Sequence, residues 1–156
     1  MPFVAERSPF YHFDPIEYGS GFPERKRVIM VDIKFFRCDK CGNIVTKLVD
    51  SGAPLSCCGQ PMTELVPNTV DAATEKHVPV IAVEGNVVTV TVGEVEHPME
   101  EDHYIQFIML HTTKGTQTVR LQPGDKPQAT FVLADGVEPV EAFEYCNKHG
   151  LWSAKA

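Results

Sequence analysis

Cysteine placement is the strongest constraint on the fold, because four of the five cysteines lie in two short stretches, "CDKCG" (38–42) and "CCGQPM" (57–62). Cys38 and Cys41 are separated by two residues, so one turn can present both sulfurs, and the glycine that follows lets backbone amides point at them. Cys57 and Cys58 supply two more thiolates from a second glycine-bearing loop. Four thiolates from two such loops predict a tetrahedral site for zinc or iron.

The adjacent pair Cys57-Cys58 adds a geometric demand, because neighbouring side chains do not easily reach one metal at ideal angles. We therefore expect a distorted tetrahedron. The alternative is a redox dithiol accompanied by two ordinary buried cysteines. Spacing alone does not choose between iron and zinc.

Hydrophobic periodicity elsewhere is almost entirely of period two, with no apolar stripe at helical spacing. The segment "VPVIAVEGNVVTVTVGEV" contains two β-branched runs around Gly85-Asn86, which is typical of a hairpin with a two-residue turn. Several short strands separated by turn residues predict a β-sandwich. The expected strands lie within residues 78–95, 103–112, 116–122 and 129–135.

Length and charge limit the other possibilities. A chain of 156 residues forms one domain or two small ones. The formal net charge of −7 argues against nucleic-acid binding, which needs a basic surface, and no apolar run reaches the ~20 residues that span a bilayer. The first 29 residues have no apolar segment of the kind found in signal peptides, so we expect a cytoplasmic protein. In that reducing compartment, clustered cysteines more often bind metal than form disulfides.

Composition divides the chain into three parts. Residues 1–29 are rich in proline, glycine and charge and are expected to form an arm of unknown role. Residues 30–66 hold the four clustered cysteines, and residues 67–156 hold five of the six histidines and the last cysteine. The stretch "VPNTVDAAT" (66–74) is the expected linker between the two domains.

A second group of candidate ligands lies in the β-rich part. Each histidine taken alone is more typical of a surface or a satisfied core position than of a ligand. Imidazoles gathered with a thiolate in one small domain instead indicate iron, copper or zinc, and five protein ligands favour iron because zinc ordinarily takes four. His12 and His111 are interpreted as bystanders. The candidate ligands are His77, His97, His103, Cys146 and His149.

These motifs carry a family resemblance. "FRCDKCGNIV…CCGQPM" resembles the small iron domain of desulforedoxin, and "EKHVPV…HPMEEDHYI…EYCNKHG" followed by Trp152 is similar to the catalytic domain of superoxide reductases. Their order and spacing resemble the desulfoferrodoxins, which are two-iron superoxide reductases. The resemblance covers about residues 31–156 and leaves the arm unexplained.

The resemblance implies a small rubredoxin-like or desulforedoxin-like domain with an iron bound by the four clustered cysteines. An immunoglobulin-like β-sandwich follows it, with a second iron bound by four histidines and one cysteine. The resemblance further implies that the four histidines surround this second iron, that Cys146 is its axial thiolate, and that one position stays open. Superoxide would be reduced there to hydrogen peroxide without production of dioxygen.

The same resemblance implies roles for two residues beside the ligand His77. Lys76 would attract the anion and help deliver a proton, and Glu75 would cap the open position in the ferric state. A rubredoxin-like electron donor and a homodimer are also implied.

Two other functions are compatible with the residues. A Cys-x-x-His near the end of a β-sandwich also occurs in blue-copper electron carriers, but two histidines would then be left over and no methionine follows His149. Zinc in both sites would instead give a metal-stabilised binding module. An optical spectrum distinguishes iron, copper and zinc.

Overall fold

The computed structural model of the chain describes residues 32–156, and the arm expected over residues 1–29 lies outside this range. Within the described range nearly every regular element is a strand. The one helix found there, α1 (Thr74–His77), is a single turn and too short to cross a membrane. The expectation of a mainly β chain, with a small metal-binding unit followed by a β-sandwich, is confirmed.

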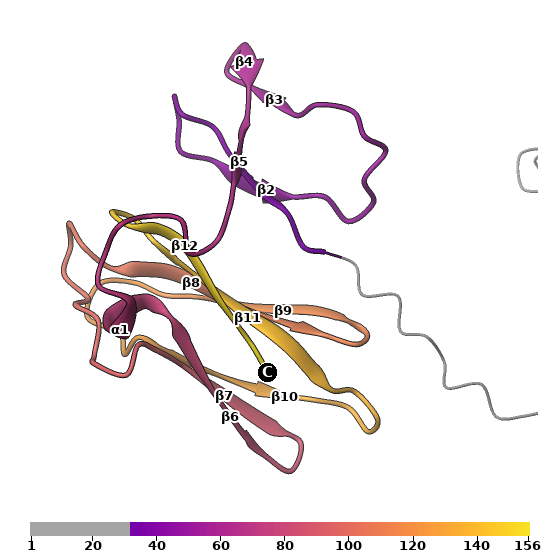
Figure 1. Cartoon of the computed structure of the whole chain (residues 1–156), viewed down its shortest axis with the longest axis vertical. Helices are drawn as coiled ribbons and strands as arrows, with labels where there is room; N and C mark the ends of the chain where they lie inside the picture. The colour runs from indigo at the N-terminus through magenta and orange to yellow at the C-terminus, as the bar shows by residue number, and fades with distance from the viewer. Residues whose placement is uncertain (1–31) are drawn as a thin grey trace, which may run out of the picture.

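The small unit comes first and consists of very short strands (Figure 1). Its central strand pairs on both sides to give an antiparallel sheet in the order β2-β1-β5, and a separate two-stranded ribbon carries the second cysteine pair. The strands are β1 (Phe35–Arg37), β2 (Ile44–Thr46), β3 (Ser56–Cys57), β4 (Gln60–Pro61) and β5 (Thr63–Leu65).

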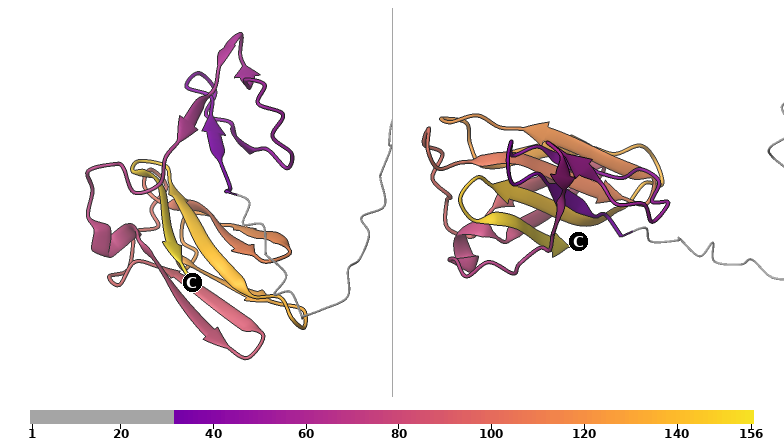
Figure 2. Two further views of the ribbon diagram at one scale, coloured as in Figure 1. Left: turned by 45° about the vertical axis from the view of Figure 1, so that its right-hand side comes forward. Right: turned by 90° about the horizontal axis from the view of Figure 1, so that it is seen from above.

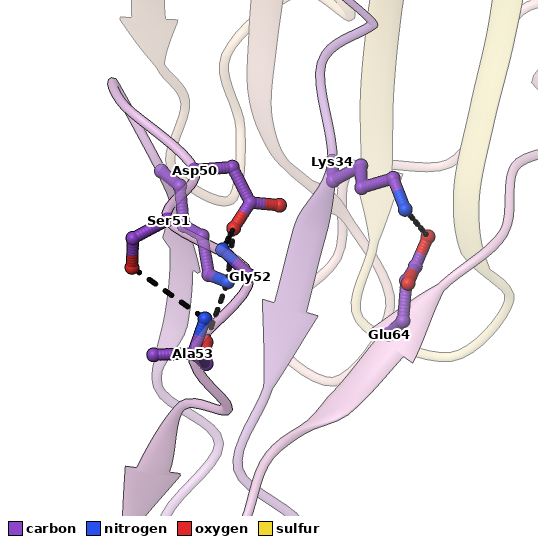
Figure 3. A network of polar contacts seen from close by, with 7 residues as sticks. Lys34, Asp50, Ser51, Gly52, Ala53 and Glu64 are labelled. Atoms are coloured by element: carbon purple, nitrogen blue, oxygen red, sulfur yellow. Dashed lines mark hydrogen bonds and ion pairs between the residues drawn. The ribbon is translucent and has the colours of Figure 1, made fainter.

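Exposed polar contacts supplement these short ladders (Figure 3). Lys34 Nζ lies 3.4 Å from a carboxylate oxygen of Glu64, which links β1 to β5. In the loop before β3, Lys47 Nζ donates to Asp50 at 2.6 Å, and the same Asp50 oxygen accepts the N–H of Gly52 at 2.9 Å. Exposed ion pairs contribute about 0–1 kcal/mol each, so they do not stabilise the unit alone.

The sandwich consists of two antiparallel sheets whose facing sides enclose the main core (Figure 2). One sheet has the order β10-β7-β6 and the other has the order β12-β11-β8-β9. Along β7, Val88, Val90 and Val92 are fully buried, as alternation in a one-face-buried strand requires. The strands are β6 (Pro79–Glu84), β7 (Val87–Val92), β8 (Ile105–Thr112), β9 (Gly115–Arg120), β10 (Gln128–Val132), β11 (Pro139–Cys146) and β12 (Gly150–Lys155).

The strands of the sandwich up to β10 were predicted from the sequence, whereas the two strands after β10 were not. β6 and β7 meet at the expected two-residue turn, where Gly85 has a φ of 63°. β11 and β12 were not predicted, although β11 is central to its sheet. From Ala142 to Cys146 every residue of β11 is buried, so both faces are covered and the period-two signal disappears.

A second apolar cluster seats the small unit on the outer face of the four-stranded sheet (Figures 1 and 2). The ring of Phe35 lies 5.1 Å from that of Phe143 and 5.9 Å from that of Phe107.

The linker between the two domains is held to β12 by hydrogen bonds. Asn68 Nδ2 donates to the carbonyl of Ser153 at 3.1 Å, and the N–H of Ser153 donates back to Asn68 Oδ1 at 3.0 Å. The edge of β12 is therefore covered by the expected linker.

Candidate metal centres

The structure brings the four clustered cysteines together at the tip of the small unit. Their sulfurs all lie within 4.8 Å of one another. Cys38 is buried, whereas Cys41 and Cys58 are exposed. The sulfurs of Cys41 and Cys57 are 3.6 Å apart, which is a spacing that ligands of one tetrahedral ion adopt.

Backbone geometry explains how two adjacent cysteines share this centre. Cys57 pairs with Gln60 in the β3–β4 ribbon, so Cys58 and Gly59 form a two-residue turn. Their φ values are 51° and 75°, the combination of positive φ at both central positions that a type I′ turn requires. Cys58 thus adopts a left-handed conformation, and its sulfur lies 3.9 Å from that of Cys57. The distorted tetrahedron stays a prediction.

The pKa values of the clustered thiols differ, because backbone N–H groups and neighbouring sulfurs act on them in opposite directions. Backbone N–H groups of Cys41 and Lys40 point at the sulfur of Cys38 and lower the pKa of its thiol to about 7. The neighbouring sulfurs, Cys41 first, raise the pKa of Cys58 to about 12. One thiolate therefore forms readily and the fourth resists ionisation. A bound cation would remove that resistance, since coordinating thiols are deprotonated.

Four imidazole rings form a second, closed group at one end of the sandwich. His77 ends α1, His97 and His103 lie between β7 and β8, and His149 lies in the turn between β11 and β12. Successive ring centroids are separated by 4.7 Å (His77–His97), 4.7 Å (His97–His103), 4.9 Å (His103–His149) and 4.7 Å (His77–His149). Because the four centroid distances are nearly equal, the imidazoles surround one central point.

Cys146 joins this ring from the end of β11. Its sulfur and candidate nitrogens of His77, His97 and His149 lie within 4.8 Å of one another. His103 is outside that tightest set, although its ring completes the circle. His77 Nε2 and His149 Nδ1 are only 2.7 Å apart. Two nitrogens bound at right angles to one ion, each at about 2.1 Å, would be separated by about 3 Å, so this pair fits a shared metal.

Buried nitrogens without hydrogen-bond partners point to the same conclusion. His97 Nδ1 donates to the carbonyl of Pro98 at 2.6 Å, which leaves its Nε2 as the lone-pair nitrogen. Among the described residues, Nε2 of His97 and Nε2 of His103 are buried without a partner. Buried polar atoms in folded proteins are normally satisfied, so these nitrogens fit a metal ligand role.

Burial also fixes the protonation states that a metal needs. Desolvation lowers the pKa values of His77 and His97 to about 4, with the neighbouring histidines adding to the effect. The pKa of His103 is lowered as well, again mainly by burial. Burial raises the pKa of the Cys146 thiol, and the N–H groups of Lys148 and His149 oppose that shift. His77 and His97 are therefore neutral donors at pH 7, and amides support negative charge on sulfur.

A close backbone approach positions the segment that contains Lys76 and His77. Gly93, just after β7, has a φ of 77°, and a Cβ there would lie 2.7 Å from the carbonyl oxygen of Glu75 and from Cα of Lys76. The N–H of Val95 donates to the same Glu75 carbonyl at 3.0 Å. Only glycine permits α1 to lie this close to the sheet.

The two remaining predicted site residues occupy different hollows. Lys76 lines a cavity of about 530 Å³ together with His97 and Glu96. Glu75 instead lines a neighbouring hollow of about 370 Å³ that does not include Lys76 or any histidine. His111 lies within β8, away from the imidazole ring, as expected.

Glu144 was missed by the sequence interpretation. It lies on β11 two residues before Cys146, so both point to the same side, and it is fully buried. Neither carboxylate oxygen has a hydrogen-bond partner among the described residues, and desolvation raises its pKa well above the usual range. The glutamate inside "AFEYC" was the available signal, but it could be recognised only if the segment had been predicted as a strand buried on both faces.

Known proteins share both parts of this arrangement. The family model for the N-terminal domain of desulfoferrodoxin matches residues 32–65, and the desulfoferrodoxin model matches residues 69–155. Relatives called desulfoferrodoxin from Syntrophotalea carbinolica and Nitratidesulfovibrio vulgaris are 50% and 46% identical over 79% of this chain and 96% of theirs. The crystal structure of the superoxide reductase from Treponema pallidum aligns with a TM-score of 0.69 and 38% identity, over 80% of this chain and 100% of that one. With a thiol cluster and an imidazole ring in the matched regions, the chain belongs to the desulfoferrodoxin family.

Proposed function

We propose that this protein is a superoxide reductase that converts superoxide to hydrogen peroxide by one-electron reduction, without producing dioxygen. The observation that carries this function is the closed ring of four imidazoles beside one buried thiol. The similarity to the Treponema pallidum superoxide reductase, which is 38% identical, supports it. Reduction of superoxide needs one electron and two protons, so the site has to supply a redox metal and a proton path.

The residues at this site would hold an iron, with the nitrogens of the four histidines and the sulfur of Cys146 as ligands. Ferrous iron supplies the electron when it is bound there. His77 and His97 are neutral at pH 7 because burial lowers their pKa values to about 4. The N–H groups of Lys148 and His149 are directed at the sulfur and moderate its donor strength. With five protein ligands, such an iron would still be able to bind a small anion.

Lys76 attracts that anion. It lines the cavity that also contains the ligand His97, and it supplies a positive charge in a protein whose formal net charge is −7. Its ammonium group can also pass a proton through water to the product. Glu75 would serve as a further carboxylate ligand when the iron is oxidised, for which its side chain would have to leave the hollow that it lines.

The thiol cluster holds a second iron, with Cys38, Cys41, Cys57 and Cys58 as ligands. We place it in a domain of residues 30–66 and the catalytic iron in a domain of residues 67–156. Electrons come from a rubredoxin-like donor, and the protein acts as a cytoplasmic homodimer. The residues 1–29 have no assigned role in this proposal.

Metal analysis combined with kinetics tests the function. The purified protein should contain two irons per chain, and its oxidised form should show tetrathiolate-iron bands plus a separate long-wavelength thiolate-to-iron band. Superoxide generated by pulse radiolysis should be consumed by reduced protein with formation of peroxide and no dioxygen. One intense blue band would indicate copper electron transfer, and a colourless zinc protein would indicate a binding module; either result would refute the proposal.

A further inference from the structure

His103 differs from the other members of the imidazole ring in its placement. The exposed fractions of His77 and His97 are 2% and 1%, whereas His103 and His149 are only partly buried. It is also the histidine that falls outside the tightest donor set. It lies in the connection between β7 and β8, where its own backbone pairs, among the described residues, only with Glu100. Its position therefore depends on the contacts that fix this connection.

One side chain, Asn147, makes such contacts on both sides of His103. Asn147 Nδ2 donates to the carbonyl of Asp102 at 3.0 Å, and Asn147 Oδ1 accepts the N–H of Tyr104 at 3.0 Å. The backbone N–H of Asn147 also donates to the carbonyl of Tyr104 at 3.2 Å. Three hydrogen bonds thus bracket His103 in the sequence.

Asn147 directly follows Cys146, so the same bonds join two ligand-bearing segments. The β8–β11 ladder ends at the pair Cys146 and Ile105, after a register shift between Tyr145 and Cys146. Beyond that pair the Asn147 amide takes over the role of a peptide group, because it has a donor and an acceptor on one planar unit. Alanine offers neither, and ionised aspartate offers only acceptors.

We infer that Asn147 is a positioning residue that ties the His103 segment to the Cys146 turn, so that the fourth imidazole is held at the metal. The inference rests on the proposed ligand set, in which His103 and Cys146 both bind the catalytic iron. Asn147 acts mainly through His103 and does not bind the metal; its Oδ1 also lies 4.0 Å from the sulfur of Cys146.

Asn147→Ala in the full-length, iron-loaded protein tests this role. Changes in groups that orient metal ligands typically weaken metal binding by about 10–100-fold, and we expect a loss of that size at the catalytic site alone. Competition with a chelator, followed at the long-wavelength thiolate band, measures it without relying on activity. The band should also shift as one imidazole is lost. Asn147→Asp keeps the volume and the acceptor for Tyr104, so its loss should be smaller, and it serves where the alanine variant does not fold.

Asn68 provides a matched control, because it makes an equivalent set of bonds elsewhere. Its side chain exchanges two hydrogen bonds with Ser153, and its backbone N–H donates to the carbonyl of Leu151 at 3.1 Å. Asn68→Ala should lower the denaturation midpoint while leaving affinity at the catalytic site within about twofold. An equal loss of iron in both variants would show a general structural effect and overturn the inference.

A double-mutant cycle with His103→Ala completes the test. If Asn147 acts through His103, its substitution should weaken metal binding little further in the His103→Ala background. Independent, additive losses would overturn the positioning role. If His103→Ala alone leaves iron affinity and spectrum unchanged, the proposed ligand set is wrong, which is distinguishable from a failure of Asn147→Ala alone.

Discussion

The two candidate metal centres are built in opposite ways. The thiol centre takes its ligands from residues 38–58, in two tight loops of a unit with very short strands, and two of its sulfurs are exposed. The imidazole centre takes its ligands from residues 77–149, at one end of a sandwich, and Cys146, His77 and His97 are buried. The first centre is formed by local turns, whereas the second is formed by the tertiary fold.

This difference sets what each centre contributes. The small unit has only short ladders, exposed ion pairs and the apolar cluster around Phe35, so a bound metal would add substantially to its stability. The sandwich has its own apolar core, so it can hold neutral histidines and a buried thiol in place before metal arrives. Such preorganisation is what a redox site for a small anion needs.

The largest expected effect comes from replacing one candidate ligand in each of the two centres. Cys146→Ser should abolish the long-wavelength band and reduce the superoxide reaction by more than the ~10–100-fold typical of changes outside the ligand set. Cys41→Ser should remove only the tetrathiolate-iron bands and leave superoxide reduction largely intact. Spectra, iron content and stopped-flow rates check both. Loss of the catalytic iron in Cys41→Ser would contradict two independent centres.

A second expected effect concerns the close approach beneath α1. Gly93→Ala should destabilise the protein by about 3 kcal/mol, since the left-handed conformation and the contacts of the added Cβ both carry a cost. Gly85→Ala is the matched control, because Gly85 has a φ of 63° but open space around it. We expect about 1–2 kcal/mol there. Urea unfolding measures both, and equal losses would show that the contact with α1 is unimportant.

Substitution of Lys76 tests whether the imidazole centre needs a positive charge nearby. Lys76→Ile should slow the second-order reaction with superoxide by roughly one to two orders of magnitude. High salt should slow the wild type more than this variant, because screening weakens the attraction of Lys76. Lys76→Arg should retain most of the rate if charge alone matters.

A charge control for Lys76 is available at the other end of the sheet. Lys114→Ile removes the same charge from the β8–β9 turn, at the end of β8 opposite to the site, and should leave the rate nearly unchanged. Pulse radiolysis across a salt series gives the comparison. If the two variants react equally fast with the same salt dependence, Lys76 does not steer the substrate.

A last expected effect is a pH dependence of stability, to which the imidazole centre contributes. In the metal-free protein the pKa values of His77 and His97 are about 4, below their usual 6.5. Between these values the unfolded chain binds more protons, so the free energy of unfolding falls as pH falls, by up to about 1.4 kcal/mol per pH unit for each histidine. Urea unfolding at pH 7, 6 and 5 should show this slope. Burial raises the pKa of Glu144, which opposes this slope in the same pH range, so the measurement is repeated in Glu144→Gln, where a flat profile would contradict neutral, buried histidines.

The two centres also differ in how far they could be predicted from the sequence. The thiol site could be predicted because its spacing is local, although no pattern indicated that Cys58 would adopt a φ of 51°. The imidazole site could be assembled only by treating distant histidines together and by family resemblance. β11 was missed because it is buried on both faces, and with it the burial of Glu144. Hydrogen bonds such as those of Asn147 depend on tertiary packing and have no signal in a single sequence.

The ligand order along the chain has a consequence for biosynthesis. Cys58 completes the thiol set 91 residues before His149 completes the imidazole set. At a translation speed of about 5–20 residues per second, four thiols emerge some 5–20 s before the second centre can exist. During that interval the complete thiol set can bind a metal while the imidazole set still lacks His149. The order of the ligands along the chain therefore lets the thiol centre load first, from the ions present in the cell while the chain is still being made.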